Sequence, residues 1–571
     1  MDDIQLTQHS FAMKALNQPE HRFHDLHHLI CRRDWVEFAL DAVLNNTGSR
    51  TAGVDGVTKK RFEEAEFRDM YVTKLLTSLK SNTYRPQPCC RHWIPKANGS
   101  GDKRGLGIPT IQDRVVQMLL KMLLEPIFES DFLDCSNGFR PGRRTMDCVD
   151  MCFKLISSLH KYYWVIEGDI SKCTPSKGRP FDTIQHTTLI RLIERRVDDH
   201  RIMALIKYFL DAGVMEDGLV SPTTEGTPQG GVVSPLLANI YLHEFDKWWW
   251  ERMGKLEGYQ KGQRRRKGNA NYRLIRYADD FVILSNGTKE QAYAIRDEAQ
   301  QFLKENLQLE LNLDKTHVTH ATDGFDFLGF HIQYMEPLDN KPWLRVTPAD
   351  KTVERLKNKV REMTDRQQSY DTVLYKFMAL NRVLRGWINY YRHVNAKRSA
   401  RKLDWWVKAR LVGWLEDKHG LGYRQIQAIY ELQQTPNRKN YGVKDAEGGI
   451  VYLFKMTDVH LTRYRASKRS NPYIDPEQHQ TQITSNSDTA LINVDAAWTG
   501  QTNQNAWYEV RLKVLERDEY QCRQCGSKDA LDVHHIRARR DGGSDDPDNL
   551  MTLCRTCHMK TNSFGQRKST S

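Results

Sequence analysis

The sequence lacks the features that mark membrane-spanning and exported proteins. Its 571 residues contain no run of about 18 consecutive apolar residues, the length that a membrane-crossing helix needs. The opening segment, MDDIQLTQHS, is polar and acidic. It has neither the charged and then apolar start of a secretory signal nor the Arg-rich character of a transit segment. We therefore expect no membrane partner.

Cysteine is scarce, at 11 residues in the whole chain, and an odd total does not suit a disulfide framework. Four of these cysteines form two Cys-x-x-Cys pairs near the C-terminus: Cys522, Cys525, Cys554 and Cys557. Paired spacing of this kind indicates metal binding in a reducing compartment. We expect a cytoplasmic protein, associated with the nucleoid in a bacterium, and an organellar origin stays open.

What the chain has in excess is positive charge. Lys and Arg total 85 against 72 Asp and Glu, which gives a net charge of +13 and a pI near 9.1. This balance favours a polyanionic partner, and nucleic acid is the leading candidate. With 39% hydrophobic residues the chain is not disordered, and its length predicts three or four structural units.

The excess charge is concentrated in one helical stretch. Residues 346–440 have apolar residues at helical spacing, and residues 351–410 contain 16 Lys or Arg against 5 Asp or Glu. A solvated helix face would normally carry both signs of charge, so this imbalance favours a surface that contacts RNA or DNA. Before this stretch, residues 86–345 alternate helical and strand-like patterns.

Three aspartates form the first candidate site. Asp279 and Asp280 lie between two strand-like runs, which predicts a hairpin with the carboxylates at its turn. Asp169 ends a third strand-like run. Carboxylates on adjacent strands suit two Mg²⁺ ions that catalyse phosphoryl transfer. An Asp-Asp pair in an ordinary surface turn is the alternative.

Six segments together resemble the reverse transcriptases encoded by group II introns. They occur in the family's order: Gly105–Arg114, Asn137–Arg143, Gly226–Leu242, Tyr277–Asp280, Leu311–Thr316 and Phe325–Phe330. The resemblance implies a right-hand polymerase in which Asp169 and Asp279 bridge two Mg²⁺ ions and Asp280 supports them. It also places four residues at the nucleotide: Gln229 beside the incoming nucleotide and primer, Lys96 and Arg104 at the triphosphate, and Lys315 at the active end of the palm. A solvated surface lysine is the alternative for Lys315.

The sequence departs from the family pattern after Asp169. The residues 174–180 intervene between Cys173 and Phe181, whereas the family usually continues without a break. Phe181 would normally stand next to the sugar of the incoming nucleotide and exclude a 2′-hydroxyl. Either an extruded loop returns Phe181 to that place, since closing such a loop costs little entropy, or the insertion damages sugar selection or polymerisation.

The basic helical stretch resembles the thumb, or maturase domain, of the same family. Arginines alternate with aromatic residues around Trp387, Trp405, Trp406 and Trp414, a composition that suits stacking on structured RNA. Tryptophans at helical spacing are more often part of a core. The cations of this stretch are therefore the preferred RNA-binding residues.

The two Cys pairs bracket a His-His dipeptide, and this region resembles the HNH endonuclease module. Four thiolates suffice for one structural Zn²⁺, so a plain zinc ribbon is the alternative. The resemblance implies that His534, His558 and Asn562 hold a catalytic ion, Mg²⁺ or another divalent metal. It also implies that His535 is the general base, because neutral imidazole accepts a proton from water, and that Asn549 fixes the loop that aims His535.

The expected fold is therefore a multidomain α+β chain: right-hand polymerase fingers and palm, a helical thumb or maturase domain, and a small zinc-stabilised ββα-metal HNH domain. The expected segments are an N-terminal helical extension and start of the fingers (1–85), reverse transcriptase fingers and palm (86–345), the thumb or maturase domain (346–440), a DNA-binding region (441–475), a linker (476–505) and the HNH endonuclease (506–571).

The function that follows is that of a group II intron-encoded protein. It would bind its intron RNA, assist splicing, nick target DNA and copy the intron by target-primed synthesis from deoxynucleoside triphosphates. Two alternatives stay open: an RNA-binding maturase whose polymerase is impaired by the insertion 174–180, and a reverse transcriptase unrelated to introns. The oligomeric state does not follow from the sequence.

Overall fold

The computed structural model describes most of the chain as two compact units. The described residues are 3–95, 103–157, 159–171, 184–216, 219–221, 231–312, 316–336, 342–368, 371–445, 448–464, 471–476, 514–515, 517–519, 521–527, 531–536, 547–554 and 557. The first unit comprises Met1–Leu380 and Trp387–Leu491, and the second comprises Asn381–Gly386 and Ile492–Ser571. None of the described helices has both the length and the apolar character needed to cross a bilayer.

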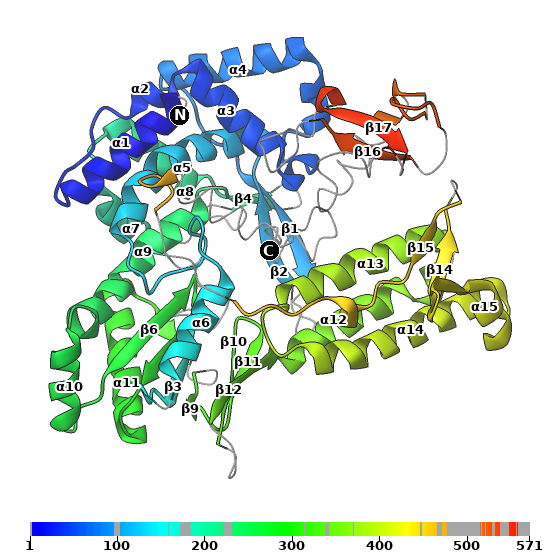
Figure 1. Ribbon diagram of the computed structural model, residues 1–571. Coiled ribbons are helices and arrows are strands. Elements are labelled where there is room, and N and C mark those ends of the chain that lie inside the picture. The colour runs from blue at the N-terminus through cyan, green and yellow to red at the C-terminus, as the bar shows by residue number, and fades with distance from the viewer. Residues whose placement is uncertain are drawn as a thin grey trace, which may run out of the picture. The chain divides into compact units, whose positions relative to one another are not determined.

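Helices dominate the N-terminal part and the part after residue 350, as the sequence predicts (Figure 1). Their bounds are α1 Asp3–Asn17, α2 His27–Ile30, α3 Arg33–Leu44, α4 Ala65–Lys80, α5 Ile111–Asp131, α6 Thr145–Leu155, α7 His186–Glu194, α8 His200–Asp211, α9 Ser234–Trp249, α10 Gly258–Arg266, α11 Lys289–Leu307, α12 Asp350–Met363, α13 Val373–Tyr390, α14 Lys397–His419 and α15 Tyr423–Tyr430.

The strands in the described part of the chain form five small sheets. Their bounds are β1 Cys89–Pro95, β2 Lys103–Ile108, β3 Trp164–Ser171, β4 Val214–Glu216, β5 Leu219–Ser221, β6 Tyr272–Tyr277, β7 Asp280–Ser285, β8 Glu310–Leu311, β9 Val318–His320, β10 Phe325–Phe327, β11 Phe330–Met335, β12 Trp343–Pro348, β13 Glu431–Thr435, β14 Arg438–Lys444, β15 Ile450–Tyr452, β16 Leu531–His535 and β17 Leu550–Cys554. The sheet orders are β2-β1-β4-β5, β6-β7-β3-β8 with β9 also paired to β3, β10-β11-β12, β13-β14-β15 and β16-β17.

The sheet that contains β3, β6 and β7 is the centre of the first unit. The helices α6, α9 and α11 pack against it (Figure 1). One continuous hydrophobic core runs from α1 through this sheet to β8, and it encloses the indole rings of Trp35 and Trp249. Because this core is dry and closely packed, strands that cross it are held in a fixed position.

The helix α5 shows how a sequence motif produces local structure. Thr110 caps it, because its hydroxyl accepts a hydrogen bond from the Asp113 N–H at 3.1 Å. Asp113 is buried and accepts hydrogen bonds from the hydroxyls of Tyr84 at 2.5 Å and Thr110 at 2.7 Å. Arg114 donates to the backbone carbonyls of Gly48 and Thr51. The motif around residue 110 thus ties α5 to the N-terminal helices.

A second motif depends on a buried ion pair. Arg140 donates three hydrogen bonds of 2.7 to 3.1 Å to the carboxylate of Glu129, and both side chains are almost completely buried. Its remaining donors reach the carbonyl oxygens of Leu133 and Ser136 at 2.7 and 2.8 Å. Since every partner lies between residues 129 and 136, Arg140 fixes the chain that follows α5.

The helical region after residue 350 is docked on the β10–β11 hairpin. Leu328 and Gly329 form its two-residue turn, both with positive φ, at +51° and +81°. The hydroxyls of Tyr390 and Tyr391 donate to the carbonyls of these two residues at 2.9 and 3.1 Å. The predicted apolar stripe of α13 is buried, with Phe377 and Leu380 fully enclosed. Beyond α15 the region continues into β13, which the sequence prediction did not include.

The segment after β15 returns to the N-terminal half of the first unit. The Tyr464 hydroxyl donates to Asp147 in α6 at 2.9 Å, and the Tyr473 hydroxyl donates to Glu125 in α5 at 2.7 Å. His9 in α1 contacts the Tyr473 carbonyl oxygen at 2.7 Å. This segment lies within the predicted DNA-binding region, and these three contacts attach it to α1, α5 and α6.

We predict that Glu129→Ala destabilises the first unit by about 3–5 kcal/mol, because it leaves the Arg140 guanidinium buried without its carboxylate. Glu37→Ala is the matched control. It breaks the exposed pair that Glu37 forms with Arg33, and exposed pairs contribute at most about 1 kcal/mol. Urea denaturation followed by tryptophan fluorescence measures both variants. Equal shifts of the two unfolding midpoints would contradict this role of Arg140.

Candidate functional site

The three predicted aspartates are brought together by the central sheet. The strands β3 and β7 are antiparallel, and Asp169 lies directly opposite Asp280. Side chains of directly opposed residues point to the same face, with Cβ atoms about 5 Å apart. Asp279 lies in the two-residue turn between β6 and β7, next to Asp280. The predicted hairpin is thus present, with one carboxylate in its turn and the other on its second strand.

Two backbone features shape this site. Ala278, the first turn residue, has φ of +56°, a left-handed conformation that costs a residue with a side chain about 1–2 kcal/mol. Gly168, which precedes Asp169, lies opposite Phe281 in the ladder. A Cβ atom at Gly168 would lie 2.1 Å from the buried Phe281 ring, so only glycine fits there.

A buried ion pair between β6 and α9 supports the turn. Arg276, two residues before Ala278, donates two hydrogen bonds to Asp246 in α9, at 2.8 and 2.5 Å. Both side chains are fully buried. Burial alone would raise the pKa of Asp246, but the guanidinium overrides that effect and holds the pKa at about 2. The pair is therefore ionised at neutral pH.

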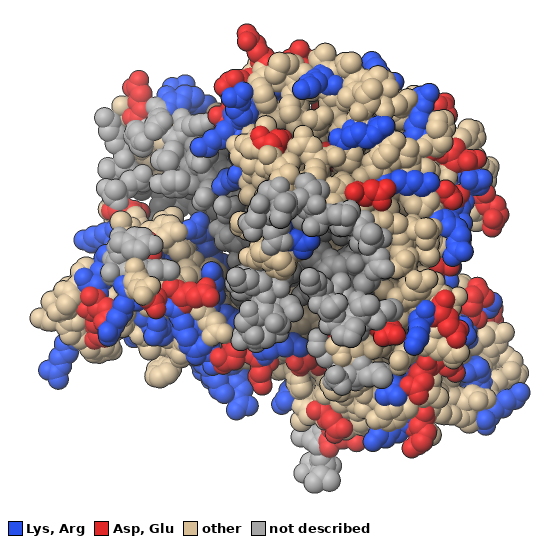
Figure 2. Space-filling view, turned by 180° about the vertical axis from the view of Figure 1, so that it is seen from behind, with Lys and Arg blue, Asp and Glu red and all other residues tan. Residues whose placement is uncertain are grey.

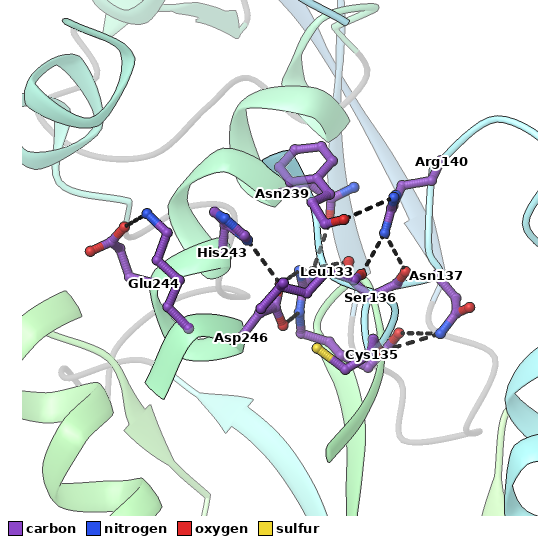
Figure 3. Close-up of polar contacts among 12 residues, drawn as sticks. Leu133, Cys135, Ser136, Asn137, Arg140, Asn239, His243, Glu244 and Asp246 are labelled. Carbon is purple, nitrogen blue, oxygen red and sulfur yellow. Dashed lines mark hydrogen bonds and ion pairs between the residues drawn. The ribbon is translucent and has the colours of Figure 1, made fainter. Parts of the chain in front are cut away.

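The remaining donors of Arg276 attach this ion pair to the turn and to the segment beside it. Arg276 Nη1 donates to the Ala278 carbonyl and to Asn239 Oδ1, both at 3.0 Å, and Nη2 donates to the Ser136 hydroxyl at 2.7 Å. Asn239 in turn donates to the Gly138 carbonyl at 2.8 Å. Figure 3 shows Ser136, Asn137, Asn239 and Asp246 grouped around these contacts.

The segment 135–138 lies directly against the turn. The Arg276 N–H donates to the Cys135 carbonyl at 2.7 Å, and the Asn137 N–H donates to the Arg276 carbonyl at 2.9 Å. A Cβ atom at Gly138 would lie 2.3 Å from the Ala278 nitrogen. The Asn-Gly-Phe-Arg-Pro motif therefore packs directly against the Tyr-Ala-Asp-Asp turn and supports it.

Sequence reasoning missed Arg276 and Asp246. The available signal was Arg276 in a strand-like run immediately before the aspartates, since a charge inside a buried strand needs a partner. Nothing local pointed to Asp246, which lies 30 residues upstream on a helix.

Several predicted nucleotide-binding residues lie outside the described residues: Lys96, Phe181, Gln229, Lys315 and the insertion 174–180. Arg104 lies in β2, opposite Ile94 in β1. Just after the Pro-Gln-Gly-Gly segment, the Val232 N–H donates to Gln117 Oε1 in α5 at 2.6 Å. This bond fixes the point where that segment enters α9.

The helix α14 presents a cationic surface. Arg398, Arg401, Lys402 and Trp405 are exposed on it, and the Trp405 side chain is 73% accessible to solvent. Trp414 is buried, as expected of a core tryptophan, so the two indoles have different surroundings. Figure 2, which views the molecule from behind, shows many Lys and Arg side chains at the lower left, in the part that holds α12–α14, with Asp and Glu side chains among them. Exposed cations around an exposed indole suit contact with an RNA backbone and an unstacked base.

In the second unit, β16 and β17 form an antiparallel pair that contains the His-His dipeptide. His535 lies opposite Leu550, and the Ile536 N–H donates to the Asn549 carbonyl at 2.8 Å. Asn549 is thereby held beside His535. Because side chains alternate along a strand, His534 and His535 point to opposite faces of the pair and have different surroundings. His558 and Asn562 lie outside the described residues.

The four predicted cysteines converge. The Sγ atoms of Cys522, Cys525, Cys554 and Cys557 all lie within 4.8 Å of one another, and Cys525 and Cys554 are 3.6 Å apart. A tetrahedron with Zn–S bonds of about 2.3 Å has edges of about 3.8 Å, so the cluster is compatible with zinc. Burial raises the pKa of Cys522, but backbone N–H groups outweigh it and lower that pKa to about 6. At Cys525 the Ser527 N–H lowers the pKa but the neighbouring thiols outweigh it and raise that pKa, and the neighbouring thiols also raise the pKa of Cys557. Among these three residues a thiolate, the form that binds metal, is therefore favoured at Cys522.

Comparison with protein families assigns all three regions. Residues 94–332 match the family described as reverse transcriptase (RNA-dependent DNA polymerase). Residues 353–428 match the group II intron maturase-specific domain, and residues 522–564 match the HNH endonuclease. The predicted presence of reverse transcriptase, maturase and HNH endonuclease domains is thereby confirmed, and both enzyme families use divalent metals.

Individual relatives agree with this assignment. Protein YkfC of Escherichia coli K12 is 38% identical over 344 residues, which cover 57% of this chain and 87% of YkfC. The group II intron-encoded protein LtrA of Lactococcus lactis subsp. cremoris is 34% identical over 360 residues, 54% of this chain and 57% of LtrA. The match therefore spans little more than half of LtrA. An uncharacterised 91 kDa protein in the cob intron of Schizosaccharomyces pombe is 26% identical over 93% of this chain and 68% of its own length.

Three findings lead to one assignment. They are the order of the three domains, the placement of the aspartates and cysteines, and the similarity to the relatives. The chain belongs to the group II intron-encoded reverse transcriptases with a maturase domain and an HNH endonuclease domain.

Proposed function

We propose that this chain copies its own intron RNA into DNA at a nicked target site. The observation that carries the proposal is the placement of Asp169 opposite Asp280, with Asp279 in the adjoining turn. Three carboxylates on a rigid sheet are hard oxygen ligands of the kind that Mg²⁺ prefers. When bound, two Mg²⁺ ions would activate the primer 3′-hydroxyl and neutralise the leaving pyrophosphate.

The protein residues contribute orientation in this proposal. Asp169 and Asp279 would hold the two ions, and Asp280 would support them from the start of β7. Arg276 acts as a positioning residue, because its side chain is fully buried and contacts the turn through the Ala278 carbonyl. Gln229, Lys96, Arg104 and Lys315 are proposed to contact the nucleotide, with Phe181 excluding a 2′-hydroxyl.

RNA binding is proposed to depend on the helical region. The exposed cations of α14 supply a surface for phosphodiesters, and Trp405 supplies a stacking platform. Binding of the intron RNA at this surface would assist splicing by holding the folded RNA, and deoxynucleoside triphosphates would be the polymerase substrate. The residues 441–475 are proposed to contact target DNA.

The HNH domain is proposed to nick the target DNA strand whose new 3′-end primes synthesis. His535 would take the proton from the attacking water, and His534, His558 and Asn562 would hold the divalent ion, Mg²⁺ or another metal. The backbone contact between Ile536 and Asn549 supports the proposed role of Asn549 in orienting His535. The four cysteines would hold Zn²⁺, whose binding contributes to folding of this small unit.

The experiment that tests the whole proposal is primer extension on an RNA template with the purified chain and Mg²⁺. Synthesis supports a working polymerase. A chain that binds the intron RNA and promotes splicing without any extension would instead be a maturase whose polymerase the insertion 174–180 impairs.

Asp279→Ala is expected to lower DNA synthesis by on the order of 1,000-fold, because metal stabilisation of the transition state is worth several kcal/mol. Intron RNA affinity should stay within a few-fold, since it depends on distributed cations. Primer extension and filter binding measure the two quantities. Asp323→Ala, at an exposed carboxylate, is the control and should change neither. Parallel losses of synthesis and RNA affinity in a folded Asp279 variant would refute the separation.

Arg276→Lys is expected to lower the kcat of DNA synthesis by roughly 10- to 100-fold, because lysine keeps a positive charge near Asp246 but lacks the planar fork that reaches the turn. KM for the nucleotide and intron RNA affinity should change little. Ser136→Ala, which removes a single hydrogen bond to Arg276, should give a smaller loss in the same direction. Arg252→Lys, at a half-exposed arginine, is the control. An unchanged kcat in Arg276→Lys would show that the turn does not need this support.

His535→Ala is expected to abolish DNA nicking while the chain keeps its zinc, because this residue is assigned to proton abstraction. Cys525→Ala should lose zinc and unfold the HNH unit, since metal binding and folding are coupled. Neither change should alter primer extension. Metal analysis and a nicking assay on the full chain decide between the two roles. Loss of zinc in His535→Ala, or full nicking activity, would contradict the assignment.

A further inference from the structure

The helix α10 is a basic element that the polymerase and nuclease sites do not use. Residues 258–267 contain five Lys or Arg and no Asp or Glu. None of the residues of α10 is buried, so hydrophobic packing does not explain its composition. It is held by polar contacts instead: a capping box of Glu257 and Gln260, and a hydrogen bond from Asn271 Nδ2 to the Lys261 carbonyl at 3.0 Å.

The cations of α10 lack compensating carboxylates. Arg265, Arg266 and Lys267 are exposed, and no ion pair joins them to an acidic side chain within the part of the chain that the structure describes. Lys261 is partly buried near Arg273. Burial lowers the pKa of Lys261, and the Arg273 guanidinium lowers it further. Three neighbouring cations that form no ion pair with a described carboxylate make a site that an external anion would stabilise.

The same helix carries an exposed aromatic ring. Tyr259 is 65% accessible to solvent, and its hydroxyl accepts a hydrogen bond from Gln263 Nε2 at 2.7 Å. Tyr259, Gln263 and Arg266 are separated by four and three residues, so they lie on one face of the helix. The glutamine holds the ring in place beside the cations. An oriented ring next to cations suits stacking of an unpaired base together with backbone contact, which is typical of RNA recognition.

The position of α10 separates it from catalysis. It precedes β6, whose other end leads into the Ala278–Asp279 turn. A strand advances about 3.3 Å per residue, so the six residues of β6 place α10 roughly 20 Å from the catalytic turn. Figure 1 shows α10 at the margin of the first unit, beside α11. Only a primer–template duplex of more than about six base pairs, at about 3.4 Å per base pair, would be long enough to reach from the aspartates to this surface.

We propose that Tyr259–Lys267, the α10 surface, is a second RNA-binding surface, which holds structured intron RNA through phosphodiester contacts and one stacked base. This inference rests on the proposed function, because that function supplies an intron RNA large enough to reach beyond the catalytic site. The ligand is RNA, and duplex DNA is the competing outcome that the experiment separates.

The test compares two triple variants of the full chain. Arg265→Gln with Arg266→Gln and Lys267→Gln removes the exposed cations of the surface. The control, Lys154→Gln with Lys247→Gln and Lys304→Gln, makes the same change in net charge at lysines that are already paired with carboxylates. The probes are a transcript of the intron that surrounds this coding sequence and a short duplex DNA, measured by filter binding across a range of KCl concentrations.

We expect the surface variant to reduce the salt slope of RNA binding by about 2 and the affinity by about 100-fold at 0.1 M salt, since each lost phosphate contact removes about 0.7 from the slope. The control should leave the salt slope unchanged and keep the RNA affinity within a few-fold. Tyr259→Ala should weaken RNA binding about tenfold without changing the slope, because stacking carries no charge. Extension of a short primer on a short RNA template should be unchanged in all variants.

Specific outcomes overturn the inference. The inference is wrong if the surface and control variants bind RNA equally well. It is also wrong if the surface variant loses affinity only for duplex DNA. A parallel fall in short-template extension would make the surface part of the polymerase site instead. If the unaltered chain does not bind the intron transcript, the proposed function fails, and this inference fails with it.

Discussion

The ion pair between Arg276 and Asp246 is the interaction on which the polymerase site depends. Burying two charges is costly unless each is paired and its remaining hydrogen-bonding groups are satisfied. Here the guanidinium meets Asp246, Asn239, Ser136 and the carbonyl of Ala278 at once. The same bonds that stabilise the buried charge hold a turn whose first residue is left-handed. The cost of that conformation is thus offset by a network behind the turn, and Asp279 and Asp280 are kept in a fixed position.

Catalysis and RNA binding place opposite demands on the chain. Phosphoryl transfer needs carboxylates fixed to within a fraction of an ångström. The aspartates proposed for it lie on β3, on β7 and in the turn between β6 and β7, beside strands that cross the hydrophobic core. RNA binding draws on many phosphate contacts, each weak and replaceable, and needs cations that reach solvent. The exposed faces of α14 and α10 meet that second demand, because few of their cations are engaged by carboxylates of the protein itself. A substitution in the core therefore affects the polymerase more than the RNA affinity.

The HNH unit is under a different constraint, because a small domain has little hydrophobic core to stabilise it. The structure describes two hydrophobic clusters in this unit, and each contains only a few residues. One comprises Val514, Leu515, Val533 and Leu550, and the other comprises Leu553 and the cysteines. The HNH match spans only residues 522–564, and domains this short usually need a metal or a cross-link because they have little room for a hydrophobic core. The convergence of four thiol groups next to β17 is compatible with that need. The histidines and Asn549 occupy the other end of the same strand pair, so one antiparallel strand pair joins the cysteine cluster to the candidate catalytic residues.

Local patterns determined a large part of this protein. The apolar stripe of α13, the hairpin at Tyr277–Asp280 and the paired cysteines could all be predicted, because helical spacing, turn chemistry and ligand spacing act over a few residues. Only the tertiary structure decided that Asp280 lies opposite Asp169 and that Trp405 is exposed whereas Trp414 is buried. It also decided that Arg276 meets Asp246 and Ser136, which are 30 and 140 residues away in the sequence. Partners at such separations are chosen by how helices and strands pack around a shared core, and no periodicity in a single sequence records that choice.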